Sequence, residues 1–314
     1  MVNFVTHLFV IVTLKLSTIT TYLTGLQHHL VMNDIPKTVW SKELHQVMSG
    51  YQRDEAAISP MIQRFKIPFT RHMILSSKTL MSSWLGKDSF WVIAMHAALC
   101  MGFMFLFRKS EFLTKSDRKP KVNDNGIIVT LQAEDVELWF NGVGYKATEW
   151  MNFPEFPCEM LSMFLRGGKS DQFGKGASRW NIAEPGNPHC MVKVIEQYVR
   201  GAKLRKDDCF FAGPLITISS IDLASIMKAT CVHLGIDEKK CTLHSIRIGG
   251  LVTLFAAGVP DSLKQLAGRW ASPTSFIVYA RATMAQFSQI SSALNDPNLV
   301  TSDDIKRFYK HVRK

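Results

Sequence analysis

The longest apolar run of the chain covers residues 89–107 and reads SFWVIAMHAALCMGFMFLF. Within it, His96 is the only side chain that carries a charge near neutral pH. A helix of this length could cross a bilayer, or it could be packed on all sides inside a large domain. Either way, the run predicts one long helix, over about residues 88–107, around which the rest of the chain must be arranged.

Composition restricts the class of protein further. The 314 residues are 46% hydrophobic and 20% charged, which indicates globular structure in one large or two modest domains. The net charge of +11 favours a polyanionic partner, either nucleic acid or an anionic membrane surface, although a basic protein with no such partner would also have this charge. The six cysteines lack zinc-site spacing, so we expect free, buried thiols in a reducing compartment.

Four residues of particular types stand at specific spacings in the C-terminal part of the chain. His244 and Arg247 are three residues apart and would share one face of a helix. Trp270 follows Arg247 by 23 residues, and Tyr279 follows Trp270 by nine. Arginine offers a planar set of donors to phosphate oxygens, and a tyrosine hydroxyl can act as a covalent nucleophile. Together they indicate a site that holds and attacks a phosphodiester.

The segment from Thr242 to Ala280 resembles the active-site half of tyrosine recombinases, the phage-integrase family, whose signature has these residue types at these gaps. The family also places an arginine after a long apolar helix, followed three residues later by an acidic residue, and Arg108 and Glu111 fit that pattern. This favours a buried helix over residues 88–107 and no membrane partner. A lysine is expected on or beside a β-hairpin between Arg108 and His244. Lys169 is our assignment and Lys175 the alternative.

The form GKSDQFGKG, and GRW in place of the commoner Gly-His, resemble recombinases of eukaryotic mobile elements of the Crypton and DIRS-like groups. The resemblance extends from about residue 68 onward, and more loosely over the residues before it. It implies site-specific DNA recombination or integration through a 3′-phosphotyrosine, without metal or cofactor. It also implies double-stranded DNA as partner, a homotetramer on DNA, and a nuclear location in a eukaryote or a cytoplasmic one otherwise.

The resemblance also implies a role for each residue of the site. Tyr279 would attack the phosphorus while Arg108 and Arg247 hold the non-bridging oxygens. Lys169 would protonate the leaving 5′-oxygen, and His244 would assist proton transfer at the tyrosine. Trp270 would pack against the phosphate or donate to it, although a Trp in this place could simply be part of the core. The supporting residues would be Glu111, which orients His244 or an arginine, and Arg269, which shares the role of Trp270.

The expected fold is α+β, mostly α with a small antiparallel sheet. Residues 1–66 would form a helical core-binding domain that clamps DNA, and residues 67–314 the recombinase catalytic domain with a C-terminal helix. In the first domain only two helices are clear, fewer than the family usually has, as a truncated gene model would give. Ser17 and Ser41 would begin them, and Gly25 and Gly50 would interrupt or end them.

A linker is expected at 64–68, where Pro68 disfavours helix in the residue before it. The catalytic domain should then contain helices over 70–84 and 88–107. Strands are expected over 126–131 and 136–140, the second ending at an Asn-Gly turn signal, and a further hairpin should join 161–166 to 178–183. Later helices are expected over 221–234 and 244–257, with another opening at Pro260.

DNA contacts should come mainly from basic side chains that touch phosphates, which bind in a salt-dependent, sequence-independent way. A solvated basic surface is the alternative for all of them. Other functions remain open: a domesticated descendant that binds DNA without cutting it, and a monomeric enzyme like the type IB topoisomerases. The candidate DNA-contact residues are Lys115, Lys119, Lys121 and Lys175, with Arg118 beside the first group and Lys203, Arg205 and Lys206 as a second group.

Overall fold

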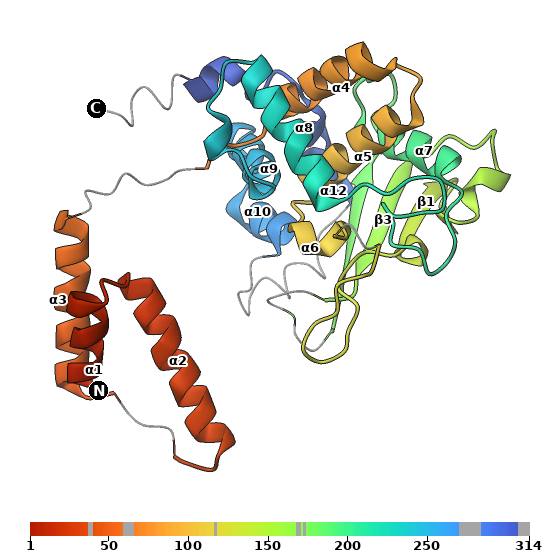
Figure 1. Cartoon of the computed structure of the whole chain (residues 1–314). Coiled ribbons are helices and arrows are strands. Elements are labelled where there is room, and N and C mark those ends of the chain that lie inside the picture. Colours follow the sequence, from red (N-terminus) through yellow and green to blue (C-terminus); the bar gives the residue numbers. More distant parts are fainter. Residues whose placement is uncertain are drawn as a thin grey trace. The chain divides into compact units, whose positions relative to one another are not determined.

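A computed structural model describes residues 1–36, 40–58, 66–115, 118–167, 171, 174–269 and 284–306. The chain divides into two compact units, Met1–Phe65 and Lys66–Lys314. This boundary lies one residue from the expected one. Each unit is described by itself below (Figure 1).

The described residues of the N-terminal unit are mainly helical, and the fully buried hydrophobic side chains among them are Val5, Ile19, Leu23 and Leu44. The expected stops at Gly25 and Gly50 are wrong, because both glycines lie inside helices. A glycine costs a helix interior only about 1 kcal/mol relative to alanine, which neighbouring helix formers can offset. The elements are α1 (Val2–Thr6), the π-helical η1 (His7–Ile11), α2 (Leu16–Met32) and α3 (Lys42–Ile58).

Of the two predicted N-caps in the N-terminal unit, one is confirmed and one is wrong. Ser41 does cap α3, since its Oγ accepts the backbone N–H of Leu44 at 3.3 Å. Ser17 does not cap α2, because the helix already begins at Leu16 and Lys15 occupies the cap position. Many large apolar side chains of this unit are exposed, including Ile11 and Met32.

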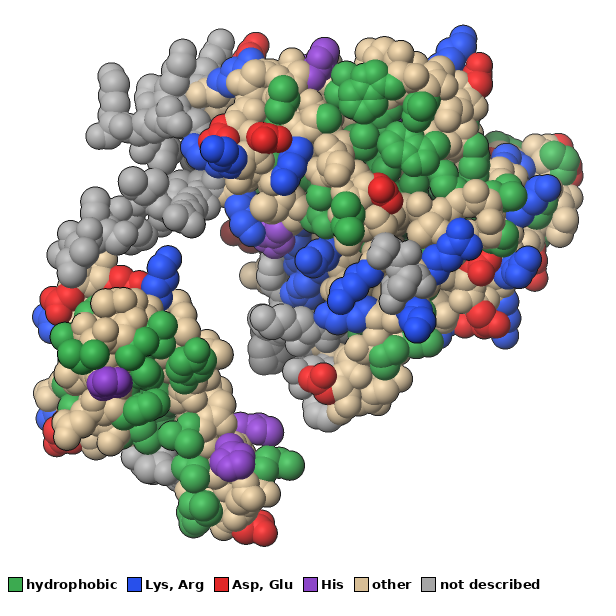
Figure 2. Space-filling model, viewed as in Figure 1, with side chains coloured by type: hydrophobic (Ala, Val, Ile, Leu, Met, Phe, Trp, Pro, Cys, Tyr) green, Lys and Arg blue, Asp and Glu red, His purple; other side chains and the backbone are tan. Residues whose placement is uncertain are grey.

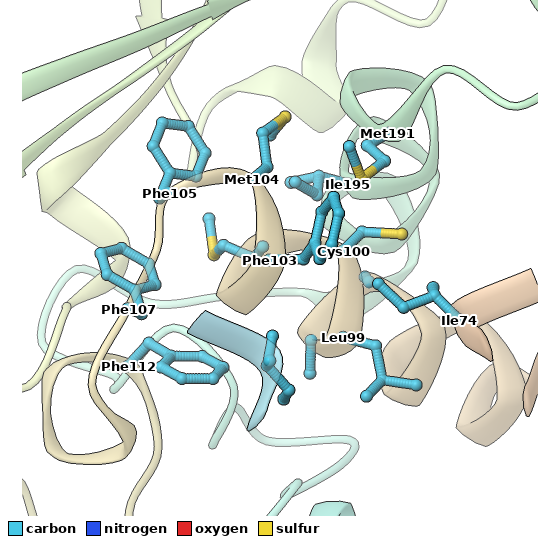
Figure 3. Packing of buried hydrophobic residues seen from close by; sticks show 14 of the residues in the cluster. Ile74, Leu99, Cys100, Phe103, Met104, Phe105, Phe107, Phe112, Met191 and Ile195 are labelled. Carbon is cyan, nitrogen blue, oxygen red and sulfur yellow. The ribbon is translucent and has the colours of Figure 1, made fainter. Parts of the chain in front are cut away.

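The apolar run forms the central helix of the C-terminal unit, α5 (Phe90–Met104), and the prediction of a helix buried on all sides is confirmed. From Ala94 to Met104 every residue is buried. Helices α4 (Arg71–Leu85), α7 (Met191–Ala202), α8 (Ser220–His233) and α9 (His244–Ala256) pack against it. Figure 3 shows how side chains of α5 meet those of α4 and α7. Among the helices in the described part of the chain, none has the length and apolar character needed to span a bilayer.

One four-stranded antiparallel sheet, in the order β2-β1-β3-β4, makes the C-terminal unit α+β. The two expected hairpins are present. The first joins β1 (Val136–Phe140) to β2 (Val143–Lys146) across Asn141 and Gly142, both with positive φ. The second joins β3 (Met160–Leu165) to β4 (Ala177–Ile182), with Leu161 opposite Asn181. Helix α12 (Met284–Asn295) packs along β4, where Ser291 Oγ accepts the Ile182 N–H at 2.9 Å.

The strand expected over residues 126–131 is not formed. Its backbone groups bond to several separate segments, since Val129 N–H donates to Lys121 O and Leu131 N–H donates to Glu111 O. Only an isolated bridge, Val122 with Ile128, has strand geometry there. The remaining short elements are α6 (Lys109–Phe112), α10 (Asp261–Gly268) and the 3₁₀ turns η2 (Ala133–Asp135), η3 (Trp150–Asn152) and η4 (Glu238–Lys240).

Candidate anion-binding site

The site begins with a close approach between α9 and the end of α5. A Cβ on Gly250 would lie 2.5 Å from the Phe103 carbonyl oxygen, and one on Gly249 would lie 2.0 Å from the Phe69 carbonyl oxygen. Only glycine permits such backbone contacts. The Gly-Gly pair in HSIRIGG therefore brings the first turn of α9, with His244 and Arg247, close to the chain that leaves α5.

A tight turn at the end of α5 then directs Arg108 toward this helix. Leu106 takes the left-handed conformation, with φ of 51°, and the Phe107 N–H donates to the Gly102 carbonyl at 3.0 Å. Arg108 follows in extended geometry as the N-cap of α6. The rings of Phe107 and Phe112 stack with centroids 5.2 Å apart next to this turn (Figure 3).

Glu111 joins Arg108, which is close to it in sequence, to Arg269, which lies 158 positions further along the chain. Its carboxylate accepts the Arg108 backbone N–H at 2.7 Å and Arg108 Nη1 at 3.1 Å. It also accepts Arg269 Nη2 at 2.6 Å. Burial would raise the pKa of Glu111, but the charge and hydrogen bond of Arg269, helped by Arg108, hold that pKa below its usual value. The carboxylate therefore stays ionised and fixes both guanidinium groups.

Arg269 is placed by an unusual backbone. It ends α10 in the left-handed conformation, with φ of 54°, and its guanidinium lies 5.6 Å from the centre of the Phe107 ring. That stacking, together with the bond to Glu111, holds a cation over the turn that presents Arg108.

Arg247 completes the group of cations. It is 3% exposed, and its Nη2 donates to the Gly268 carbonyl at 2.6 Å, which ties α9 to the end of α10. Burial lowers the pKa of Arg247 to about 10, and the positive charges of Arg269 and Arg108 act in the same direction. The three guanidinium groups thus lie close enough to repel one another, which a bound anion would relieve.

His244 begins α9 on the exposed side of this group. Partial burial lowers its pKa, and the charges of Lys66, Arg247 and Arg108 lower it further. A neutral imidazole near pH 7 can accept a proton from a hydroxyl. No sequence motif indicated Lys66 in this place, because it lies in the expected linker, far from every motif.

The charges of the site do not cancel. Arg108, Arg247 and Arg269 contribute three positive charges and Glu111 one negative charge, so the site keeps an excess of two before His244 is counted. Planar guanidinium groups at this density suit phosphate or carboxylate oxygens. Chemically, the arrangement can hold a phosphodiester and neutralise charge that builds up on it.

The structure brings together five of the residues singled out from the sequence: Arg108, Glu111, His244, Arg247 and Arg269. Glu111 orients the two arginines rather than His244. The expected lysine, tryptophan and nucleophile, Lys169, Trp270 and Tyr279, lie outside the described residues. Among the expected DNA-contact residues, Lys115, Lys119, Lys121 and Lys175 are all exposed.

The positive charge belongs almost wholly to the C-terminal unit. Residues 1–65 hold five basic and four acidic side chains, which leaves 32 basic and 22 acidic ones in the rest of the chain. Figure 2 shows Lys and Arg side chains gathered across one face of that unit. The second basic group is partly neutralised, since Lys206 pairs with Glu134 and Arg205 lines a pocket together with Asp207 and Asp208.

The cysteines and the comparisons with known proteins add two findings. All six cysteines are buried and free, as expected from their spacing. In comparisons with known proteins, no protein-family model matches the chain and no curated protein matches its sequence. Function must therefore be argued from the site itself.

Proposed function

We propose that the chain cuts and rejoins double-stranded DNA as a tyrosine recombinase, resembling those of Crypton and DIRS-like mobile elements. One observation carries the proposal: Arg108 and Arg269 bond to one buried carboxylate, Arg247 lies near enough to feel their charges, and a histidine of lowered pKa lies beside them. Such a centre binds one phosphate group and tolerates the extra negative charge of a five-coordinate phosphorus.

In this proposal the reaction needs no external energy source. The Tyr279 Oη attacks the phosphorus and forms a phosphotyrosine bond, while the bond from phosphorus to the 5′-oxygen breaks. His244 takes the phenolic proton, and Lys169 gives a proton to the departing 5′-oxygen. Arg108 and Arg247 hold the two non-bridging oxygens throughout. Attack by a 5′-hydroxyl on the phosphotyrosine then reverses these steps and rejoins a strand.

The distribution of charge supports DNA as the substrate. The C-terminal unit has an excess of ten basic residues, and lysines on the segment after α6 continue the positive surface beyond the site. Contacts of this kind bind phosphates without reading sequence. The proposed assembly is a tetramer on two duplexes, and the proposed location is the nucleus if the host is a eukaryote.

Covalent trapping tests the proposal. The protein is mixed with nicked duplexes from the ends of its own genetic element, and separately with a pool of random sequence, then run on a denaturing gel. We expect a shifted band for the wild type and for Tyr22→Phe, which changes an exposed tyrosine of the N-terminal unit. Tyr279→Phe should abolish the band.

Two other outcomes would contradict the proposal in part or in whole. A band that persists in Tyr279→Phe would exclude this tyrosine as the nucleophile. No wild-type band with either substrate, alongside salt-sensitive DNA binding, would point instead to a domesticated, catalytically silent DNA-binding protein.

A further inference from the structure

The segment that opens the C-terminal unit lies directly against the start of α9. The Ile67 N–H donates to the Lys240 carbonyl at 3.2 Å, and the Phe69 N–H donates to the Ser245 carbonyl at 2.8 Å. These two bonds run the backbone of residues 67–69 alongside that of 240–245. Pinned at both ends, the segment has a fixed position relative to His244, which immediately precedes Ser245.

Burial fixes this segment more firmly than its two hydrogen bonds alone. Ile67 is 1% exposed and Phe69 is fully buried, so both side chains anchor it in the core. Gly249 of α9 packs onto the Phe69 backbone with no room for a side chain. The expectation of an exposed linker at 64–68 is therefore wrong for Ile67. The bonds and burial of Ile67 and Phe69 therefore also hold the backbone of the residue before Ile67 close to the site.

Lys66 is that residue, and its side chain is exposed. No carboxylate among the described residues forms a salt bridge with it. Its ammonium group lies near enough to His244 to act on that ring. A compact charge on a flexible four-carbon stem can reach a phosphate beside the one that rigid guanidinium groups hold.

We propose that Lys66 binds a DNA backbone phosphate on the His244 side of the site, next to the phosphate that Arg108 and Arg247 hold. This inference rests on the proposed function, because it takes DNA as the ligand. It extends the site from one phosphate to two. It also places a DNA contact at the first residue of the C-terminal unit.

Salt dependence of non-covalent binding tests the inference. Fluorescein-labelled duplex of random sequence is titrated with wild type, Lys66→Gln and Lys66→Arg at several salt concentrations. The matched control is Lys87→Gln, which removes the same charge from an exposed position at the end of α4. Loss of one phosphate contact should lower the slope of log K against log salt by about 0.9 and weaken binding roughly three- to tenfold near 0.1 M salt.

We expect that loss for Lys66→Gln only, with Lys66→Arg close to wild type. Carbon-detected titration of the His244 ring should show its pKa rising in Lys66→Gln and unchanged in Lys87→Gln. Equal salt slopes for wild type and both Gln variants would overturn the Lys66 inference while leaving the recombinase proposal standing. A wild type that fails to bind duplex DNA would overturn the proposed function itself, and the Lys66 inference with it.

Discussion

Replacing Glu111 with glutamine should expose how much of the site depends on one carboxylate. The side chain is 1% exposed and pairs with Arg108 and Arg269, whose side chains are 30% and 12% exposed. Removing one partner of a buried pair typically costs about 3–5 kcal/mol. Because water reaches Arg108, we expect the lower end, about 3 kcal/mol, which corresponds to a fall of about 6–12 °C in Tm for a domain of this size.

Calorimetry at several pH values measures this effect, with Glu155→Gln as control because Glu155 is exposed. The pKa of Glu111 is lowered in the folded state, so its contribution is complete above the ordinary value of 4.5 and is lost as pH falls through the lowered pKa. The wild type and Glu111→Gln should thus differ at pH 7 and converge in strong acid. Equal Tm values at pH 7 would refute the idea that this carboxylate holds the arginines together.

Three further substitutions, two of them paired with a control substitution, test other parts of the fold. Gly250→Ala should lower the free energy of unfolding, measured by chemical denaturation, by about 3 kcal/mol or more, because the added Cβ would lie 2.5 Å from the Phe103 carbonyl oxygen. Gly25→Ala, with open space around it, should instead stabilise α2 by about 0.5–1 kcal/mol. Ser291→Ala should lower the free energy of unfolding by about 1–3 kcal/mol, because it leaves the Ile182 N–H without its acceptor. Ser292→Ala, at an exposed position of the same helix, should change it by less than about 0.5 kcal/mol. Equal effects of the two substitutions would contradict the packing of α12 against β4. Burial, with the charges of Arg71, Lys78 and His189, holds the pKa of His96 well below 6.5. Below about pH 6.5 the imidazole is therefore protonated in the unfolded chain but not in the folded one, and stability falls as the pH drops. His96→Leu should flatten the Tm profile between pH 7 and 5, and an unchanged profile would assign the acid sensitivity to other groups.

Local signals in the sequence were enough to predict much of the fold. The apolar run predicted α5, and the Asn141-Gly142 turn predicted the first hairpin, because both patterns depend on residues close in the chain. The stops at Gly25 and Gly50 failed because a single glycine does not outweigh its helical neighbours. The strand over 126–131 failed because β-branched residues indicate extended backbone but not a partner to pair with.

The residue types of the candidate site were predictable from the sequence, but the contacts between its residues were not. Motif spacing led to Arg108, Glu111, His244 and Arg247. Nothing local could show that Glu111 bonds to a residue 158 positions away, since that contact depends on how α5, α9 and α10 pack. The position of Lys66 beside His244 follows from two long-range backbone bonds and has no counterpart in any spacing rule.

The contact of α9 with its neighbours through Gly249 and Gly250 has a consequence for timing. Backbone lies against backbone there, so α9 has no flexible side-chain layer on which to slide or roll. This packing fixes the first turn of α9, with His244 and Arg247, relative to the chain that carries Arg108, so an anion that enters meets side chains already arranged. In the proposed reaction such an arrangement would have no loading step of its own, so any delay between DNA capture and strand cleavage would arise in other parts of the chain.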